Sequence, residues 1–403
     1  MNRVIRMLSA LVFAVGLDVA TAHAQAPGKP PHDARFDAFL KELWPDARAQ
    51  GIKRATFDLA FAGVSPDPRV IALTHRQPEF IKPVGAYVGS FASRANIATG
   101  QRKAAQWAKV LDAMEKKFGV DRWIVVANWG VETAYGGLKD RWDVFRSLAT
   151  LAEARYRHPY FRNELIVALK ILQSGTIARN RMVSSWAGAM GQTQFMPSNV
   201  IDYAIDFSGD GRPDIWTNVA DVLGSTGNYL HKGGWKRGVT WGYEVVVPRG
   251  FDYRKSRSSY ADWQKLGVRR ADGGAFPANG QGILFFPSGV PGPAILATEN
   301  YDVLKEYNNS DAYVVAVGQL ANRMRGMGPI RAAWPLNEHP LPRGRRIALQ
   351  KALAALGYKV KEFEGHIDFD LRDMIRAEQA KFGMLPDGNP TEALLARLGV
   401  KPR

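Results

Sequence analysis

The sequence predicts a mainly α-helical protein with a small β-rich insertion and a C-terminal module of three helices. Apolar residues recur at helical spacing through most of residues 36–172, whereas strand-like segments are confined to residues 243–287. Three more amphipathic segments follow a proline-rich stretch near the C-terminus. A chain of 403 residues, 46% of them hydrophobic, is long and apolar enough for two domains with real cores.

The main domain is assigned to residues 36–328. Its first helix shows the pattern clearly, because Phe36, Phe39 and Leu43 fall on one helical face. The expected helices cover residues 36–97 (several helices), 106–118, 123–135, 163–172 and 302–325. The expected strands are YEVVVP at 243–248 and GILFFP at 282–287, and turn-forming residues between them predict a β-rich insertion.

The C-terminal module is assigned to residues 344–403. Residues 329–343 are rich in proline and basic residues, which is typical of an interdomain linker. Helices are expected over 346–356, where Gly357 provides a C-cap, and over 371–382 and 391–398. Because such a linker would separate the two domains, we expect the main domain to fold without this module.

The N-terminus has the pattern of a secretory signal peptide. A basic start precedes an apolar run at residues 7–17, and the small-residue motif AHA follows at 22–24. The alternative is a buried N-terminal helix, which would not require the AHA motif. We therefore expect a signal peptide at 1–24, a linker at 25–35, and an exported, soluble protein of the periplasm. No later segment is long and apolar enough to cross a membrane.

Composition excludes several classes of protein. The chain has no cysteine, which excludes disulfides, zinc thiolates, thiol catalysis and a lipid anchor on an acylated cysteine. The formal net charge is +16, which favours polyanionic partners. Export argues against nucleic acid as that partner, and a solvated charge bias without a specific partner remains the alternative.

Glu132 is the first candidate catalytic residue. It lies in WGVETAYGG (residues 129–137), where it is the one charge in an apolar, aromatic helix. Desolvation in such a helix raises the pKa of a carboxyl group, which then stays protonated and can donate a proton near neutral pH. The alternative is a structural glutamate that caps a helix or pairs with an arginine.

Two polar segments follow farther along the chain. SSWAGAMGQTQFMPS (residues 184–198) is dense in small, amide and hydroxyl side chains, and YNNS (307–310) is followed by Tyr313. Amides and hydroxyls are the usual partners of sugar hydroxyl and acetamido groups. Together with the segment around Glu132, they resemble the B-type membrane-bound lytic murein transglycosylases, a family with a lysozyme-like α+β catalytic domain. The resemblance covers residues 36–324.

The resemblance implies a role for each matched residue. Glu132 falls on the family's sole acid/base. The other matches fall on the cleft: Ser185 and Gln194 beside the glutamate, Tyr307 and Asn308 as polar groups that hold the glutamate and the sugar, and Tyr229 and Tyr313 as aromatic positions of the saccharide groove. Tyr229 is supported only by the short segment GNYL at 227–230.

The implied reaction cleaves the MurNAc-GlcNAc β-1,4 bond of peptidoglycan and leaves a 1,6-anhydromuramoyl end. Glu132 acts first as acid and then as base, so one carboxyl group suffices and no cofactor is required. Two alternatives are a hydrolase of lysozyme type, which would need a second carboxylate nearby, and a non-catalytic wall-binding scaffold. Asp140 and Asp143 follow Glu132 closely, but their polar setting predicts a surface loop.

An acidic loop, DFSGDGRPD at residues 206–214, resembles the first part of an EF-hand. Oxygen ligands at alternate positions and a glycine at the sixth suit a hard cation such as calcium. The expected ligands are Asp206, Ser208, Asp210 and the Arg212 carbonyl, with Asp221 closing the site because Thr217 stands where a glutamate is usual. Members of the resembling family can carry such a loop. The alternative is a tight turn without metal.

The C-terminal module resembles the three-helix peptidoglycan-binding domain in LQKAL (residues 349–353), LGY (356–358) and PDG (386–388). It departs from that pattern at EGHIDFD (364–370), where residues similar to Gly-Pro-Lys-Thr are commoner. The expected partner is the peptidoglycan glycan strand, and the protein is expected to act as a monomer without a transmembrane segment.

Overall fold

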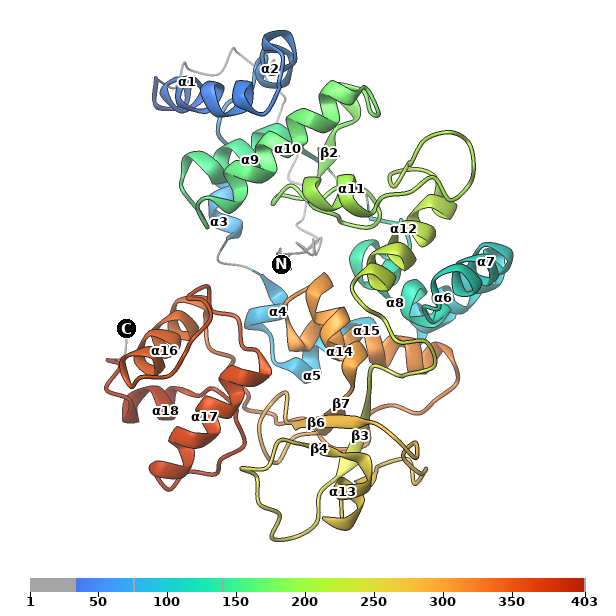
Figure 1. Cartoon of the computed structure of the whole chain (residues 1–403), viewed down its shortest axis with the longest axis vertical. Helices are drawn as coiled ribbons and strands as arrows, with labels where there is room; N and C mark the ends of the chain where they lie inside the picture. Colours follow the sequence, from blue (N-terminus) through green and yellow to red (C-terminus); the bar gives the residue numbers. More distant parts are fainter. Residues whose placement is uncertain (1–33, 75–76, 139–140, 402–403) are drawn as a thin grey trace, which may run out of the picture. The chain divides into compact units, whose positions relative to one another are not determined.

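The computed structural model describes residues 34–74, 77–138 and 141–401 (Figure 1). The predicted signal peptide, most of the predicted linker at 25–35, and Asp140 lie outside the described residues. The chain divides into two compact units. In the described residues, the first unit comprises 78–131 and 227–401, and the second comprises 34–77 and 132–226 apart from their gaps.

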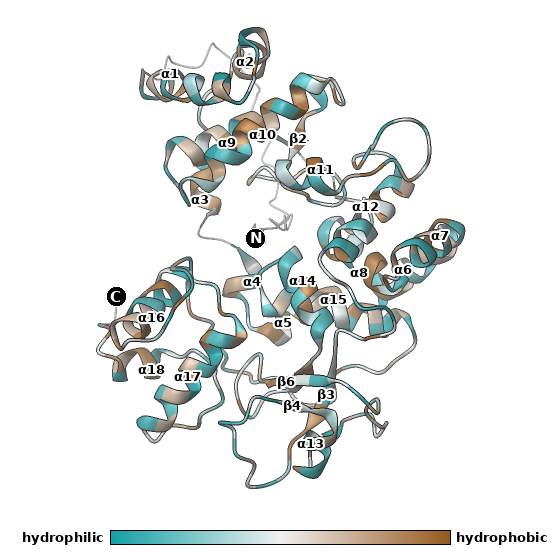
Figure 2. Ribbon diagram, viewed as in Figure 1, coloured by the Kyte–Doolittle hydropathy of each residue, from teal (hydrophilic) through white to brown (hydrophobic). Residues whose placement is uncertain are grey.

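The second unit is built from helices around a small two-stranded sheet. Its α-helices are α1 (Ala34–Ala49), α2 (Arg54–Phe61), α3 (Pro68–Leu73), α9 (Val144–Glu153), α10 (Tyr160–Ser174) and α11 (Pro197–Tyr203). Strands β1 (Trp142–Asp143) and β2 (Val183–Ser184) pair antiparallel. In Figure 2 the ribbons of α9 and α10 change between hydrophobic and hydrophilic colours, as amphipathic helices packed on a core should.

A buried glutamate joins two helices of this unit. Glu164 of α10 is 3% exposed and accepts hydrogen bonds from the backbone N–H (2.9 Å) and hydroxyl (2.7 Å) of Ser198 at the start of α11. Burial outweighs these bonds and raises the pKa of Glu164 to about 7. Glu164 therefore serves as a structural cap for α11.

The first unit contains the remaining helices. Its N-terminal helices are α4 (Pro78–Ile81), α5 (Val84–Phe91), α6 (Arg94–Gln106) and α7 (Ala108–Phe118). Helices α8 (Arg122–Thr133) and α12 (Val219–Lys232) cross the boundary between the units, after Val131 and before Gly227. The C-cap of α7, Gly119, has φ +73°, a left-handed conformation that glycine adopts without strain.

The β-rich insertion is a five-stranded antiparallel sheet of order β4-β6-β7-β3-β5, with α13 (Tyr260–Lys265) beside it. The strands are β3 (Gly242–Val246), β4 (Arg257–Ser259), β5 (Arg269–Arg270), β6 (Gln281–Phe285) and β7 (Ala294–Ala297). The predicted strands correspond to β3 and β6, whereas β7, which pairs with both, was not predicted. Trp263 is fully buried in its core and donates to the Gly282 carbonyl (3.0 Å).

The prediction of one helix over residues 302–325 is wrong. The structure has two helices there, α14 (Glu299–Tyr307) and α15 (Asp311–Met324). Asn308 is extended and ends α14, and the Ser310 side chain caps α15 by accepting from the Tyr313 N–H (3.4 Å). The polar segment 307–310 is therefore a helix–helix junction.

The C-terminal module consists of α16 (Arg343–Ala355), α17 (Phe369–Lys381) and α18 (Glu392–Arg397). Its own apolar core includes Leu349, Leu353, Ile375 and Leu394, each fully buried. Thus the three predicted helices are present. They enclose a small core of the kind expected of a separate module.

This module nevertheless packs tightly against the rest of the first unit. Lys305 of α14 and Arg372 of α17 both form ion pairs with Asp311 of α15, at 2.6 and 2.7 Å, and all three side chains are at most 10% exposed. The Phe369 ring lies 5.2 Å from the ring of Phe285. Buried ion pairs and an aromatic contact therefore join the module to the main domain.

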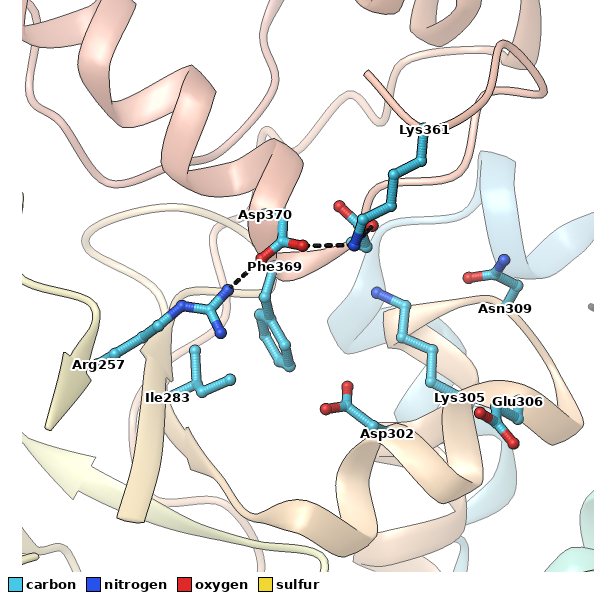
Figure 3. Close-up of a pocket in the computed structure, with 10 residues that line it drawn as sticks. Arg257, Ile283, Asp302, Lys305, Glu306, Asn309, Lys361, Phe369 and Asp370 are labelled. Atoms are coloured by element: carbon cyan, nitrogen blue, oxygen red, sulfur yellow. Dashed lines mark hydrogen bonds and ion pairs between the residues drawn. The ribbon is translucent and has the colours of Figure 1, made fainter. Parts of the chain in front are cut away.

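Figure 3 shows another part of this contact, a cavity of about 330 Å³. Arg257 of β4 and Lys361 approach Asp370 of α17 from opposite sides, and both form ion pairs with it. Phe369 points from α17 toward Ile283 of β6. The charged lining of this cavity therefore contains ion pairs between the sheet and the module.

The predicted linker also makes specific contacts. The Glu338 carboxylate accepts a hydrogen bond from the Val84 N–H at the start of α5 (2.9 Å). A Cβ placed on Gly85 would lie 2.4 Å from the ring of Trp334, so that ring sits directly on α5. Residues 329–342 thus run along the first unit as a packed segment.

Among the described helices, none combines the length and apolarity needed to cross a membrane.

Candidate active site

Glu132 lies in the last turn of α8, one residue before its end at Thr133. Glu132 is only 2% exposed, which fits the prediction of a carboxyl group in an apolar helix. The helix ends two residues earlier than predicted. Ala134 and Tyr135 adopt positive φ values of 49° and 60°, which break the helical hydrogen bonding before Gly136 is reached.

The end of α8 is fixed to the predicted polar segment. The Thr133 hydroxyl donates to the Gln192 carbonyl (3.3 Å) and accepts from the Gly136 N–H (3.2 Å). A Cβ on Gly136 would lie 2.3 Å from Oε1 of Gln192, and φ is +78° there, so only glycine fits. These contacts hold Glu132 next to the loop that carries Gln194.

The segment around Ser185 and Gln194 is a tight, buried loop. Ser185 is fully buried, and its backbone N–H and carbonyl bond to Ala189 (2.7 Å) and Gly188 (3.0 Å). Gln194 is 2% exposed and has a positive φ of 52°, and its amide donates to the Gly191 carbonyl (2.9 Å). Strained backbone in a non-glycine residue is common at functional sites, because surrounding contacts must hold it there.

The predicted groove residues of the first unit form an aromatic cluster. The rings of Tyr229 and Tyr307 meet at 4.8 Å edge to face, and those of Tyr307 and Tyr313 are parallel at 6.4 Å. All three residues and Asn308 are at most 5% exposed. The structure thus brings Tyr229, Tyr307, Asn308 and Tyr313 together within this unit, while Glu132, Ser185 and Gln194 belong to the other unit.

Three residues that position the site were not predicted from the sequence. Asn128 is fully buried on α8, and its side-chain amide donates to the Tyr313 hydroxyl (2.9 Å). It precedes Glu132 by four residues, which places both on one face of the helix. This spacing was a signal that could have identified Asn128. Thr133 and Gln192 became evident only from the contacts that fix the helix end.

Asp143 has a structural role. Its carboxylate caps α9 by accepting from the Arg146 N–H (2.9 Å) and forms an ion pair with Arg179 (2.5 Å). It lies at the end of β1 and is partly buried, so the prediction of a surface loop is wrong for this residue. Both oxygens are engaged, which leaves Asp143 poorly suited to act as a second catalytic carboxylate.

The acidic loop brings three carboxylates together. One oxygen each from Asp206, Asp210 and Asp221 lies within 4.8 Å of the others. Asp221 is fully buried at the start of α12, where it accepts hydrogen bonds from the N–H groups of Phe207 and Ser208, both at 2.9 Å. The structure therefore brings Asp221 beside Asp206 and Asp210.

The other predicted ligands lie in the same exposed loop. Asp206 accepts hydrogen bonds from the N–H groups of Gly209 (2.6 Å) and Gly211 (2.8 Å), which favour the ionised carboxylate and lower its pKa, the Gly211 bond most strongly. The Ser208 hydroxyl donates to Asp206 (3.2 Å), and Arg212 is exposed. A cluster of carboxylate oxygens suits a hard cation, but the same hydrogen bonds also stabilise a turn.

Comparison with known proteins gives two family matches. Residues 35–322 match the transglycosylase SLT domain, and residues 342–398 match the putative peptidoglycan binding domain. The membrane-bound lytic murein transglycosylase B of Escherichia coli is 31% identical over 245 residues, which is 58% of this chain and 65% of that protein. This chain thus aligns with slightly less than two thirds of that relative.

Solved structures are also similar. SltB3 of Pseudomonas aeruginosa, determined in complex with NAG-anhNAM-pentapeptide, is 44% identical, with a TM-score of 0.80 over 91% of this chain and all of that chain. The Escherichia coli lytic transglycosylase Slt35, determined with calcium, is 25% identical, with a TM-score of 0.61 over 75% of this chain and 96% of that chain. These matches confirm the predicted lysozyme-like, mainly α fold.

The identity of the family follows from the SLT match, which covers more than half of the chain and includes Glu132, Ser185, Gln194 and Tyr307. The chain belongs to the lytic transglycosylases with an SLT domain.

Proposed function

We propose that this protein cleaves the β-1,4 bond between MurNAc and GlcNAc in peptidoglycan and leaves a 1,6-anhydromuramoyl end. The observation that carries the proposal is the buried Glu132 at the end of α8, held against the Gln192–Gln194 loop by Thr133. Burial keeps a carboxyl group available as a proton donor. The engagement of Asp143 with Arg179 supports a mechanism with one carboxyl group.

In this mechanism the Glu132 carboxyl donates its proton to the glycosidic oxygen as the bond from that oxygen to C1 of MurNAc breaks. The carboxylate then takes the proton of the muramoyl C6 hydroxyl, and O6 forms a bond to C1. Glu132 ends protonated, as it began, and no water is consumed. A hydrolase would instead add water at C1.

The products distinguish the two reactions. Purified peptidoglycan is digested with the protein, and the fragments are analysed by mass spectrometry. We expect anhydromuramoyl ends, which are lighter than reducing ends by one water. Fragments with reducing ends only would assign the protein to the hydrolases and contradict the proposal.

We further propose that residues 1–24 direct export, that the protein acts as a monomer in the periplasm, and that the C-terminal module contacts the wall. The wall is the substrate of the family and lies outside the cytoplasm, and a match to the putative peptidoglycan binding domain covers the module. The formal charge of +16 would favour association with a wall that carries carboxylates and phosphates.

We also propose that the acidic loop binds calcium as a structural ion. The three clustered carboxylates fit a hard cation, and the related Slt35 was determined with calcium. Asp206, Asp210 and Asp221 would supply carboxylate oxygens, with Ser208 and the Arg212 carbonyl as the remaining ligands. The ion would tie the loop to the start of α12, and Glu132 chemistry does not use it.

Calcium is therefore expected to raise the melting temperature, because an ion that binds only the folded state stabilises it by mass action. In Asp210→Ala the response to calcium should disappear, whereas Asp58→Ala, which changes an exposed aspartate of the same unit, should respond like the wild type. Chelation should leave cleavage intact at moderate temperature. Melting curves that ignore both calcium and chelator would show that the loop is a plain turn.

A further inference from the structure

The acidic loop between α11 and α12 is joined by hydrogen bonds to the segment that lies beside Glu132. Ile215 and Trp216, which follow the last aspartate of the loop, both contact Gln192. The Gln192 N–H donates to the Ile215 carbonyl (2.8 Å), and its side-chain amide donates to the Trp216 carbonyl (2.9 Å). All of these residues belong to the second unit. Two separate bonds therefore fix both the backbone and the side chain of Gln192.

The contact at Ile215 is unusually close. A Cβ placed on Gly191 would lie 2.6 Å from the Ile215 carbonyl oxygen, and Gly191 has a positive φ of 65°. Only glycine fits there, because a side chain would meet backbone atoms and would require a strained conformation. The carbonyl of the same glycine accepts a hydrogen bond from the Gln194 amide (2.9 Å). Residues 191–194 are thus packed directly against residues 215–216.

Gln192 also contacts the end of α8. Its carbonyl accepts a hydrogen bond from the Thr133 hydroxyl (3.3 Å), and its Oε1 atom lies 2.3 Å from where a Cβ on Gly136 would be. Thr133 directly follows Glu132, so a shift of Gln192 would displace the residue next to the acid/base. Gln192 therefore contacts residues 215–216 as well as the end of the helix that carries Glu132.

Asp214 stabilises the turn that supplies these two carbonyls. One of its carboxylate oxygens accepts hydrogen bonds from the N–H groups of Trp216 (2.9 Å) and Thr217 (2.8 Å), and its own N–H donates to Asp221 (2.9 Å). Its side chain is 13% exposed. Burial alone would raise the pKa of Asp214, but hydrogen bonds from Thr217 and Trp216 outweigh it and lower the pKa. Hydrogen bonds to the ionised carboxylate therefore strengthen the turn.

We propose that Asp214 is a positioning residue for Glu132. It acts through Gln192 and Thr133, because the turn that it stabilises holds Gln192 in place. The inference rests on the proposed function, in which Glu132 is the acid and base. Small displacements of a catalytic group slow a reaction strongly, so a residue outside the reaction can control its rate. Asp214 is not among the ligands proposed for calcium, and its role is separate from that of the ion.

Steady-state cleavage of soluble, uncrosslinked peptidoglycan strands tests the proposal, with calcium saturating throughout. We expect Asp214→Ala to lower kcat by about tenfold to a hundredfold, because the proton donor is displaced. KM should change less, because the aromatic residues assigned to the saccharide groove are untouched. Asp214→Asn should keep most of the activity, since its amide oxygen can accept the same two N–H bonds.

Gln192→Met tests the next contact, because it loses the amide bond to the Trp216 carbonyl and leaves the acidic loop unchanged. It should also lower kcat. Asp214→Ala should then cause a smaller further loss than it causes in the wild type, since substitutions that act through one contact are not additive.

The matched control is Asp67→Ala. Asp67 is a buried aspartate of the same unit that caps α3 by accepting from the Arg69 N–H (3.0 Å). Its loss should lower stability but leave kcat near the wild-type value. Hydrogen–deuterium exchange provides a measurement without activity: residues 132–138 should exchange faster in Asp214→Ala but not in Asp67→Ala.

The inference is overturned if Asp214→Ala or Gln192→Met keeps the wild-type kcat, if Asp67→Ala lowers kcat equally, or if exchange at residues 132–138 is unchanged in Asp214→Ala. A wild-type protein that released no anhydromuramoyl ends would contradict the proposed function instead. The exchange measurement would still decide whether Asp214 fixes the end of α8.

Discussion

Glu132→Gln is expected to abolish cleavage of peptidoglycan and leave the fold intact. Glutamine has nearly the same shape as glutamic acid but cannot deliver or accept the proton that the reaction requires. Removing a general acid–base group lowers rates by about a hundredfold to ten-thousandfold. Release of anhydromuramoyl fragments is the measurement, and circular dichroism checks that the variant is folded.

Glu164→Gln provides the control for this experiment. Glu132 and Glu164 are 2% and 3% exposed and belong to the same unit, but Glu164 caps α11 through Ser198. The control variant should retain near-wild-type cleavage. If the folded Glu132→Gln protein also cleaved at a near-normal rate, the assignment of Glu132 as acid and base would be wrong.

Asp311→Ala is expected to produce the largest loss of stability. Asp311 accepts hydrogen bonds from Tyr301 (2.8 Å) and Lys305 (2.6 Å) and forms an ion pair with Arg372 (2.7 Å). Removing the carboxylate would leave two nearly buried cations without their partner. Breaking a buried ion pair in this way costs about 3–5 kcal/mol. Denaturant unfolding monitored by fluorescence measures the free energy of unfolding.

Asp252→Ala is the matched control, because Asp252 forms an exposed ion pair with Arg254 in the same unit. Water screens an exposed pair, so this variant should unfold almost like the wild type. Equal, small effects of both substitutions would show that the Asp311 cluster does not hold the module in place.

The pH dependence of stability should reveal the same cluster. Burial alone would raise the pKa of Asp311, but the Lys305 ammonium and the Arg372 guanidinium outweigh it and hold the pKa well below its usual range. An aspartate with a lowered pKa in the folded state stabilises the protein above its unfolded pKa, about 4, and this contribution is lost as the pH falls further. Asp311→Ala should therefore lose stability less steeply below pH 4 than the wild type.

Local patterns were sufficient to predict many elements of this protein. The helical spacing of apolar residues predicted α7, α8, α10 and the three helices of the module, and apolar runs bounded by turn-forming residues predicted β3 and β6. Short or interrupted elements were missed. Strand β7 has only four residues, AILA, and so short an apolar run does not distinguish a strand from a buried helix. The break between α14 and α15 depends on a cap by Ser310 that the apolar pattern over residues 302–325 concealed.

The sequence by itself determined the family motifs, the candidate glutamate and the acidic loop, because each depends on residues that are close together in the chain. Only the tertiary structure decided which distant groups meet: Asp221 with Asp206, Asn128 with Tyr313, and Asp311 with Arg372. It also revealed Glu79 as a buried carboxyl group. These contacts join residues that are 15, 61 and 185 positions apart, and local spacing carries no information about them.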